Sequence, residues 1–387
     1  MKESMRTWQE RAENILAQGC LTYSKSRRYY IEDQPSHCKS GRGQYLILPD
    51  GSTCLDTVSG FGANLIDLRN SYSLPSTLEV EYAERIVQRI GVPGWKVKLV
   101  KTGSEADQCA TRFARGFTGR KGVLKLGYSG WHNEFIAAEE PGIGCIPTDV
   151  IKCNDYKDLI SHLESDNPAP AAVIMEPVQL DMDVVQHLKR IRDLCNKRHV
   201  VLIFDEVITC FRMPQYTVSA TYNVWPDLLT TGKAAGGGYP LGICMGHKDI
   251  MDTEGVFVSG TFSGETSALL AGMEVLDRVT PSVMSFFFAR CQDFQTELQW
   301  AVKEHISILG YGTRQVLRDK VEGSLAVPRY MQEMYTRHKI LIGPVLFPRV
   351  EWSTDIYGKI INASEDVMKD FDKITLNGPA PRPIFKR

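Results

Sequence analysis

The sequence predicts an α/β protein with a mostly parallel sheet in a large domain and a smaller C-terminal α/β domain. Short, almost entirely apolar segments alternate with amphipathic stretches between about residues 97 and 245. Such apolar segments are typical of strands that are buried on both faces of a parallel sheet. From about residue 275 the pattern changes to long helical segments followed by short mixed elements, which indicates the second domain.

The individual elements follow in chain order from the spacing of apolar residues. Residues 5–18 have the pattern of an amphipathic helix. Residues 45–48 and 53–56 are expected to form a hairpin, because Asp50-Gly51 between them is a strong turn signal. Further helices are expected at 77–91, 104–117, 156–165, 184–197 and 279–304. Strands are expected at 97–99, 122–126, 171–175, 200–204, 228–231 and 242–245.

The length of 387 residues suits two or three packed units, at roughly 150 residues per domain. We expect residues 1–50 to contribute to the small domain. Residues 51–275 are expected to form the large domain that carries the functional site, and residues 276–387 the C-terminal small domain. The formal net charge of −1 provides no general attraction to nucleic acid or to an acidic membrane.

Targeting, redox and metal signals are weak throughout the chain. The N-terminus is too polar for a signal peptide, and the longest apolar runs, about five residues, are far short of the ~20 that a membrane span needs. The ten cysteines include no CxxC pair and no zinc-like grouping with histidine. We therefore expect reduced thiols, no metal site, no membrane association and a cytoplasmic location.

A buried apolar strand at 200–204 continues directly into Asp205 and Glu206. In open α/β sheets, ligands bind at the carboxyl ends of the strands, so Asp205 is a candidate site residue. The alternative is a carboxylate that caps the following helix. The segment by itself leaves both interpretations open.

Lys233 lies between the strand expected at 228–231 and three glycines at 236–238. Glycine allows a bulky group to approach the backbone. We expect this lysine to be buried with a lowered pKa, so that its neutral amine can attack a carbonyl and form a Schiff base. The segment does not fit a P-loop, because position 227 is Asp and no Ser or Thr follows Lys233. The alternative is a surface lysine in a loop.

The segment Lys-Thr-Gly-Ser-Glu-Ala at 101–106 opens the helix expected at 104–117. Free amides at a helix start, beside Gly103 and the Ser104 hydroxyl, form an anion site suited to phosphate. The alternative is an ordinary N-cap at Ser104.

A phosphate site, a strand-end carboxylate and a glycine-flanked lysine, in this order, match the requirements of pyridoxal 5′-phosphate (PLP). This cofactor needs an anion site, a carboxylate beside its pyridine nitrogen and an amine for its aldehyde. We therefore predict PLP as the cofactor, with Lys233 as the Schiff-base lysine and Asp205 as the partner of the ring nitrogen.

From about residue 40 to residue 275 the sequence resembles the class III PLP-dependent aminotransferases, and most closely their glutamate-1-semialdehyde 2,1-aminomutase-like branch. The matching segments are Lys-Thr-Gly-Ser-Glu-Ala at 101–106, Arg-Phe-Ala-Arg-Gly-Phe-Thr-Gly-Arg at 112–120, Gly-Tyr-Ser-Gly-Trp-His at 127–132, Glu-Pro-Val at 176–178, Phe-Asp-Glu-Val-Ile-Thr-Cys-Phe-Arg at 204–212, Gly-Lys at 232–233 and Gly-Thr-Phe-Ser-Gly at 260–264. The resemblance implies PLP-dependent transferase fold type I. It also implies an aminotransferase or aminomutase-like activity on a primary amine or amino acid.

The resemblance further implies roles at the matching positions. Gly103 and Ser104 would bind the phosphate, and Tyr128 and Val207 would pack on the two faces of the pyridine ring. Thr261 would reach the phosphate of the neighbouring subunit, because family members build each active site at a homodimer interface. The expected cofactor-binding set is Gly103, Ser104, Tyr128, Glu176, Asp205, Val207, Lys233 and Thr261, with Lys233 and Asp205 as the catalytic residues.

Two departures from the family leave the substrate and the reaction outcome open. Ser129 stands where relatives often have His, and the glycine-rich segment that covers the aminomutase site is shortened here to 139–148. The substrate is a small amine or amino acid, or an amino group carried on a larger molecule. Transaminase, aminomutase, racemase and decarboxylase outcomes are alternatives at this point. So are a non-catalytic PLP-binding subunit and a nucleotide-binding protein, although the glycines at 236–238 do not form GxGxxG.

Overall fold

The computed structural model describes residues 2–22, 25–26, 34–42, 44–59, 71–136, 149–165 and 168–379. Contacts divide the chain into two compact units. The first comprises Met1–Pro177, Val184–Phe211 and Gln215–Thr280, and the second comprises Val178–Asp183, Arg212–Pro214 and Pro281–Arg387. Residues 1–50 group by contacts with the first unit, whereas the sequence led us to expect them in the small domain. The domain boundaries after residues 50 and 275 stay a prediction.

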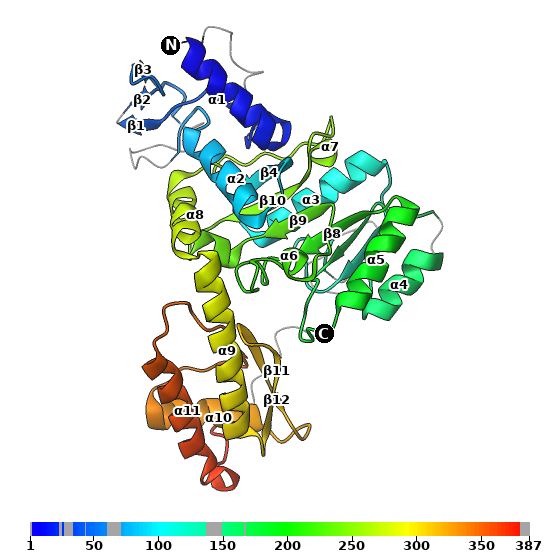
Figure 1. The fold of residues 1–387 in the computed structure, drawn as a ribbon, viewed down its shortest axis with the longest axis vertical. Coiled ribbons are helices and arrows are strands. Elements are labelled where there is room, and N and C mark those ends of the chain that lie inside the picture. The colour runs from blue at the N-terminus through cyan, green and yellow to red at the C-terminus, as the bar shows by residue number, and fades with distance from the viewer. Residues whose placement is uncertain are drawn as a thin grey trace. The chain divides into compact units, whose positions relative to one another are not determined.

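A seven-stranded mixed sheet lies at the centre of the first unit (Figure 1). Its strands follow the order β4 (Trp95–Val100), β10 (Gly242–His247), β9 (Leu228–Thr231), β8 (Val201–Asp205), β7 (Ala172–Met175), β5 (Val123–Leu126) and β6 (Val150–Lys152). Every neighbouring pair from β9 to β6 is parallel, and β10 is antiparallel to both β9 and β4. The expected mostly parallel sheet of the large domain is therefore confirmed.

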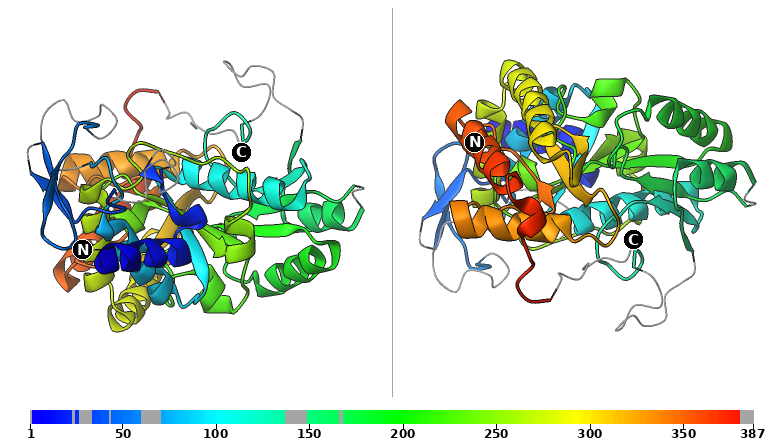
Figure 2. Two further views of the ribbon diagram at one scale, coloured as in Figure 1. Left: turned by 90° about the horizontal axis from the view of Figure 1, so that it is seen from above. Right: turned by 90° about the horizontal axis from the view of Figure 1, so that it is seen from below.

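Most strands of this sheet are buried because helices cover both faces, whereas the edge strand β6 is partly exposed. α3 (Gly103–Thr118) leads from β4 to β5, whereas α4 (Tyr156–Ser165) and α5 (Val185–Arg198) lead back along the sheet to β7 and β8. Connections between parallel strands are right-handed, so the direction in which the chain moves along the sheet decides which face its helix covers. α3 therefore lies on one face of the sheet, and α4 and α5 lie on the other (Figure 2). Every residue of β5, β7, β8 and β9 is buried, which explains why these segments are so apolar in the sequence.

The N-terminal part of the chain packs against the same unit. α1 (Lys2–Ile15) contacts α2 (Thr77–Ile90) and β4. Lys96 and Lys98, two lysines of the otherwise apolar strand β4, donate through Nζ to the carbonyl oxygens of Glu13 at 2.6 Å and Cys20 at 2.7 Å. Buried ammonium groups need such acceptors, so these two bonds bind the N-terminal segment to the sheet.

A small antiparallel sheet confirms the expected hairpin. β2 (Tyr45–Ile47) pairs with β3 (Thr53–Leu55) across the Asp50-Gly51 turn, and β1 (Ser40–Arg42) adds a third strand. Gly51 has a φ of +86°, which favours glycine at this position. The first unit also contains elements that were not expected from the sequence or are very short: β6, η1 (Ala17–Gly19), α6 (Val218–Tyr222), η4 (Lys233–Gly236), α7 (Lys248–Met251) and α8 (Thr266–Arg278).

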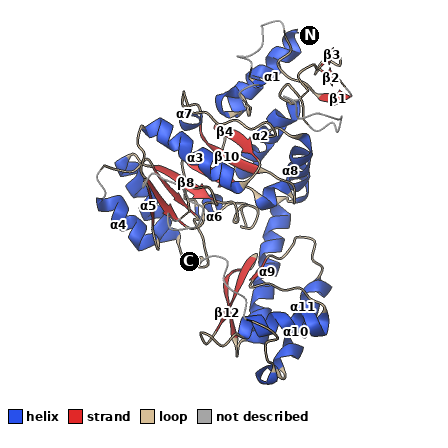
Figure 3. Cartoon of the chain, turned by 180° about the vertical axis from the view of Figure 1, so that it is seen from behind, coloured by secondary structure: helices blue, strands red, loops and turns tan. Residues whose placement is uncertain are grey.

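The second unit combines three helices with a three-stranded antiparallel sheet (Figure 3). Its elements are α9 (Pro281–Val302), β11 (Ile306–Tyr311), β12 (Arg314–Asp319), α10 (Ala326–His338), β13 (Val345–Leu346), α11 (Thr354–Met368) and η5 (Phe371–Lys373). The helix expected at 279–304 is α9. A core around Phe294, Tyr330 and Tyr357 joins α9, α10 and α11.

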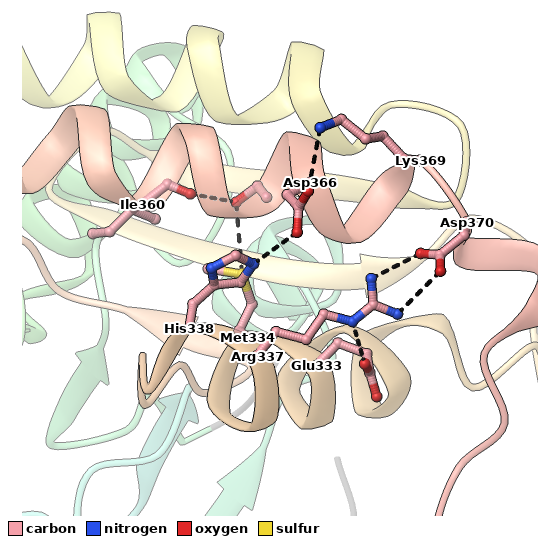
Figure 4. Close-up of polar contacts among 9 residues, drawn as sticks. Glu333, Met334, Arg337, His338, Ile360, Asp366, Lys369 and Asp370 are labelled. Carbon is pink, nitrogen blue, oxygen red and sulfur yellow. Dashed lines mark hydrogen bonds and ion pairs between the residues drawn. The ribbon is translucent and has the colours of Figure 1, made fainter.

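Ion pairs connect the surface of α10 to the end of α11 and the residues after it. Arg337 pairs with Glu333 at 2.6 Å and with Asp370 at 2.8 Å, and His338 Nε2 lies 3.2 Å from Asp366 (Figure 4). Hydrogen bonding to Asp370 and Glu333 raises the pKa of Arg337. These contacts are largely exposed, so we assign them a small share of the stability.

Among the described residues, no helix has the length and apolar character required to cross a membrane. The same residues contain no cluster of three His, Cys, Asp or Glu side chains that could hold a metal ion.

Candidate active site

Four neighbouring parallel strands each deliver one predicted site residue to the same edge of the sheet. Lys233 follows β9, Asp205 ends β8, Glu176 follows β7 and Tyr128 follows β5. The carboxyl ends of parallel strands meet at one edge, so residues that are far apart in the sequence become neighbours there.

This edge of the sheet borders a cavity of about 360 Å³, within the range of small-molecule sites. Its lining, all from the first unit, is Lys101, Thr102, Gly103, Ser104, Asp107, Tyr128, Gly130, Glu176, Asp205, Val207, Ile208, Lys233, Tyr239, Pro240 and Leu241. Seven of the eight residues expected from the sequence to contact the cofactor therefore line one cavity. The eighth, Thr261, is exposed and does not line it.

The N-terminus of α3 forms one wall of the cavity. Thr102, not Ser104, is the N-cap, so the alternative of a Ser104 cap is wrong. Thr102 Oγ1 accepts from the Glu105 amide at 3.2 Å, and Glu105 Oε2 accepts from the Thr102 amide at 2.9 Å. This capping box leaves the amides of Gly103 and Ser104 without an acceptor in the helix itself. These two amides and the helix dipole suit an anion.

At two glycines beside this wall the backbone lies very close to a neighbouring residue. A β-carbon at Gly103 would lie 2.6 Å from Val207 Cγ1, and one at Gly130 would lie 2.5 Å from Ser104 Oγ. Gly130 also has a φ of +91°, where any other residue would be strained. Side chains at these positions would occupy the space beside the helix start.

Lys233 is held in an unusual backbone conformation. It begins η4 immediately after β9 and has a φ of +38°, in the left-handed region that non-glycine residues rarely adopt. Strain of this kind is concentrated at functional sites. The side chain is exposed in the isolated chain. The expectation that Lys233 is buried was therefore wrong, because its side chain lies in the wall of the cavity and not in the packed core.

Asp205 is the opposite case, a carboxyl that is 5% exposed at the end of β8. Its Oδ1 accepts from the Val207 amide at 3.1 Å. Burial, followed by repulsion from Glu176, raises the pKa of Asp205 from 3.8 to about 6, and Lys233 opposes this rise. A carboxylate held here would be stabilised by a positive charge placed against it in the cavity.

Glu206, the next residue, has a structural role. Its two carboxylate oxygens accept from the amides of Val218 at 2.7 Å and Ser219 at 3.1 Å, and from the hydroxyls of Ser219 at 2.8 Å and Thr209 at 2.9 Å. These bonds fix the start of α6. The helix-capping alternative therefore applies to Glu206, whereas Asp205 faces the cavity.

Tyr128 and Glu176 also line the cavity, and Ser129 follows Tyr128 in the chain. Tyr128 is 44% exposed, and its amide donates to Glu176 Oε1 at 3.0 Å. Ser129, which stands where relatives often have His, is buried with a φ of +50°. The shortened segment 139–148 lies outside the described residues.

Two charged residues near the cavity were missed at the sequence level. Asp107 lies one turn beyond Gly103 on α3 and lines the cavity, so the four-residue helical spacing was an available signal. Lys125 is buried in β5 and donates through Nζ to the carbonyl oxygen of Phe135 at 2.5 Å. Burial lowers the pKa of Lys125 to about 8. The only feature of the sequence that could have identified Lys125 is that it is a charged residue inside an apolar strand.

Comparison with known proteins gives one consistent result. The model of the aminotransferase class-III family matches residues 66–305. The chain is 35% identical over 290 residues to glutamate-1-semialdehyde 2,1-aminomutase of Methanocella arvoryzae, covering 64% of this chain and 68% of that protein. It is 32% identical over 321 residues to the enzyme of the same name from Methanothrix thermoacetophila, covering 73% of each.

Solved structures show the same fold at low sequence identity. A transaminase with PLP bound superposes with a TM-score of 0.68 at 18% identity, covering 95% of this chain and 97% of the other. An omega-transaminase from Sphaerobacter thermophilus superposes with a TM-score of 0.69 at 20% identity and the same coverage.

Proposed function

Because the chain belongs to the aminotransferase class-III family, we propose that it transfers the amino group of a primary amine or amino acid, with Lys233 and Asp205 as its catalytic residues. It is a PLP-dependent aminotransferase or aminomutase-like enzyme. The observation that carries the assignment of residues is the delivery of Lys233, Asp205, Glu176 and Tyr128 to one cavity by four neighbouring parallel strands.

The residues around the cavity fit the chemical groups of PLP. The amides of Gly103 and Ser104 suit its phosphate, and the absence of a side chain at Gly103 lets the helix start lie against Val207. The buried carboxyl of Asp205 suits its pyridine nitrogen, and the exposed amine of Lys233 suits its aldehyde. When bound, PLP supplies an electron sink for the carbon that carries the amino group.

Each residue then has a separate task. Lys233 would hold the cofactor covalently through Nζ and, as a free amine, would move a proton at the carbon next to the substrate nitrogen. Asp205 would keep a proton on the ring nitrogen, which maintains the electron sink. Tyr128 and Val207, which line the cavity, would pack against the ring and orient it.

A homodimer with shared sites is part of the same proposal. Thr261 is exposed and lies outside the cavity of its own chain, as a residue that reaches the phosphate site of a neighbouring subunit would. We also assign the enzyme to the cytoplasm. The nine cysteines among the described residues are all free thiols and eight are buried, which suits a reducing compartment.

The absorption spectrum of the purified protein tests the proposal. Wild type is compared with Lys233→Ala, and with Lys248→Ala as a matched control that removes an exposed lysine outside the cavity. We expect a visible band of the lysine-bound cofactor in wild type and Lys248→Ala and none in Lys233→Ala. Bleaching of this band by one member of a panel of free and carrier-attached amines, with release of a carbonyl product, identifies the substrate class. A wild-type protein that gives no band after PLP is added contradicts the proposal.

A further inference from the structure

Asp107 is a buried acid in the wall of the cavity that has no task in the reaction described above. It is 1% exposed in the second turn of α3, and it lines the same cavity as Asp205. We propose that Asp107 is a positioning residue that carries a proton and donates it in a hydrogen bond to the Asp205 carboxylate, fixing Asp205 for the cofactor nitrogen. This inference rests on the proposed function of the site.

Strand pairing places Asp107 beside Asp205. Thr230 on β9 is the register partner of Asp205 on β8, and its Oγ1 donates to Asp107 Oδ1 at 2.5 Å. The Glu206 amide donates to the Thr230 carbonyl at 2.8 Å, which fixes the position of Thr230 relative to the end of β8. Asp107, on α3, is therefore held against β8 and β9, the two strands that lead to the proposed catalytic residues.

The two acids line the same cavity, and Thr230, the register partner of Asp205, donates to Asp107, so the two carboxyl groups are neighbours. A carboxylate only accepts hydrogen bonds, so a bond between the two requires that one of them is protonated. The groups around the pair decide which one. Glu176 repels a negative charge on either acid, whereas Lys233 favours the charged form of Asp205. Burial and repulsion from Asp205 raise the pKa of Asp107 well above its ordinary value.

Other charged or titratable groups near Asp107 leave this assignment unchanged. The ammonium group of Lys125 is bonded to the Phe135 carbonyl. Cys244 lies close to Asp107, and burial keeps its thiol protonated by raising its pKa. Within the described part of the chain, Asp107 has no bond to a positively charged group, since its hydrogen bond from Thr230 comes from a neutral hydroxyl. A buried acid in these surroundings keeps its proton.

A protonated Asp107 has two consequences for Asp205. The pair carries one negative charge in total, which matches the single positive charge of a protonated pyridine nitrogen. The hydrogen bond also lowers the proton affinity of Asp205, so that the shared proton stays on the ring nitrogen. With the Val207 amide on Oδ1, the carboxylate plane is held from two sides.

Two substitutions of Asp107 separate the effect of hydrogen-bond donation to Asp205 from the effect of filling the space. Asp107→Asn keeps a donor toward Asp205 and an acceptor for Thr230, whereas Asp107→Leu has a similar volume and neither function. The readouts are the 15N chemical shift of ring-labelled PLP in the holoenzyme and the steady-state constants with a reactive amine. We expect Asp107→Asn to keep the protonated-nitrogen shift. We expect Asp107→Leu to move that shift and to lower kcat roughly tenfold to a hundredfold with little change in KM, as the loss of a hydrogen bond to a charged group predicts.

Other results of these experiments would contradict either the role of Asp107 or the proposed function. The inference is overturned if Asp107→Leu has the nitrogen shift and the kcat of wild type. It is also overturned if Asp107→Asn lowers kcat as much as Asp107→Leu does. If Asp107→Leu does not fold, Thr230→Val decides, because it removes only the hydroxyl that holds Asp107. A smaller change in the same direction supports the inference, and an unchanged nitrogen shift overturns it. A wild-type protein without the lysine-bound cofactor band contradicts the proposed function instead.

Discussion

A β-carbon on Gly103 would lie 2.6 Å from Cγ1 of Val207. The two residues are 104 positions apart in the sequence, yet the start of α3 and the second residue after β8 are packed so closely that a side chain on Gly103 would not fit. Gly103 belongs to the proposed phosphate site and Val207 to the proposed ring site. This contact therefore sets how closely the proposed phosphate site approaches the proposed ring site.

Gly103→Ala is expected to weaken PLP binding by about tenfold to a hundredfold, since overpacking of this kind typically costs 1–3 kcal/mol. The dissociation constant is measured by titrating the cofactor-free protein. Gly358→Ala is the matched control: Gly358 lies within α11, and a β-carbon there meets no heavy atom within 4 Å. The control should raise the free energy of unfolding by about 1 kcal/mol and leave PLP binding unchanged. Equal PLP affinity in wild type and Gly103→Ala would contradict the role given to this contact.

Asp205→Asn and Glu206→Gln are expected to have opposite effects, although the two residues are adjacent. Asp205→Asn removes the proposed partner of the ring nitrogen and should lower kcat at least about a hundredfold without lowering the thermal midpoint. Glu206→Gln places an amide group among four donors and should reduce the free energy of unfolding by about 1–3 kcal/mol. Differential scanning calorimetry and steady-state kinetics separate the two effects. A Glu206→Gln protein as stable as wild type would show that the four bonds are unimportant.

The cofactor-free protein is expected to lose stability as the pH rises from about 4 to 6, because of Asp205. Burial and Glu176 raise the pKa of Asp205 from 3.8 to about 6, so between these values the folded protein binds more protons than the unfolded chain. The free energy of unfolding then falls with rising pH, by up to about 3 kcal/mol in total. Asp205→Asn lacks this effect, and its stability relative to wild type should increase until about pH 6 and then level off. Denaturant unfolding of both proteins across this range is the measurement, and a constant difference would contradict the prediction.

Subunit mixing tests the proposed role of Thr261 in a shared site. Thr261→Asp should repel the phosphate of a neighbouring subunit, and Lys233→Ala removes the reactive amine, so each homodimer should be inactive. After mixing and exchange, half of the dimers are mixed, and one of their two sites is intact. Activity should therefore return to about a quarter of wild type. Thr261→Ser, mixed in the same way, controls for the exchange procedure. Activity that stays at zero after exchange has been confirmed would argue against a shared site.

The chemistry-bearing residues were accessible from the sequence because each one interrupts a local pattern. An apolar strand that ends in Asp205 and a lysine among glycines at Lys233 are exceptions that neighbouring residues alone reveal. Apolar segments alternating with helices were enough to predict the mostly parallel sheet, since burial on both faces demands such composition. α6 and α8 were missed, because short or weakly bounded helices have little periodicity of their own.

The sequence by itself determined the class of fold and the cofactor chemistry, and it was enough to propose Lys233 and Asp205 as catalytic residues. Only the tertiary structure decided that Thr102 caps α3, that Lys233 is exposed, and that Asp107 and Asp205 face each other. The physical reason is the range of the interactions. Strand composition and turn chemistry act between near neighbours along the chain. The protonation of a buried acid depends on groups brought together from α3, β8 and β9, and no local pattern specifies them.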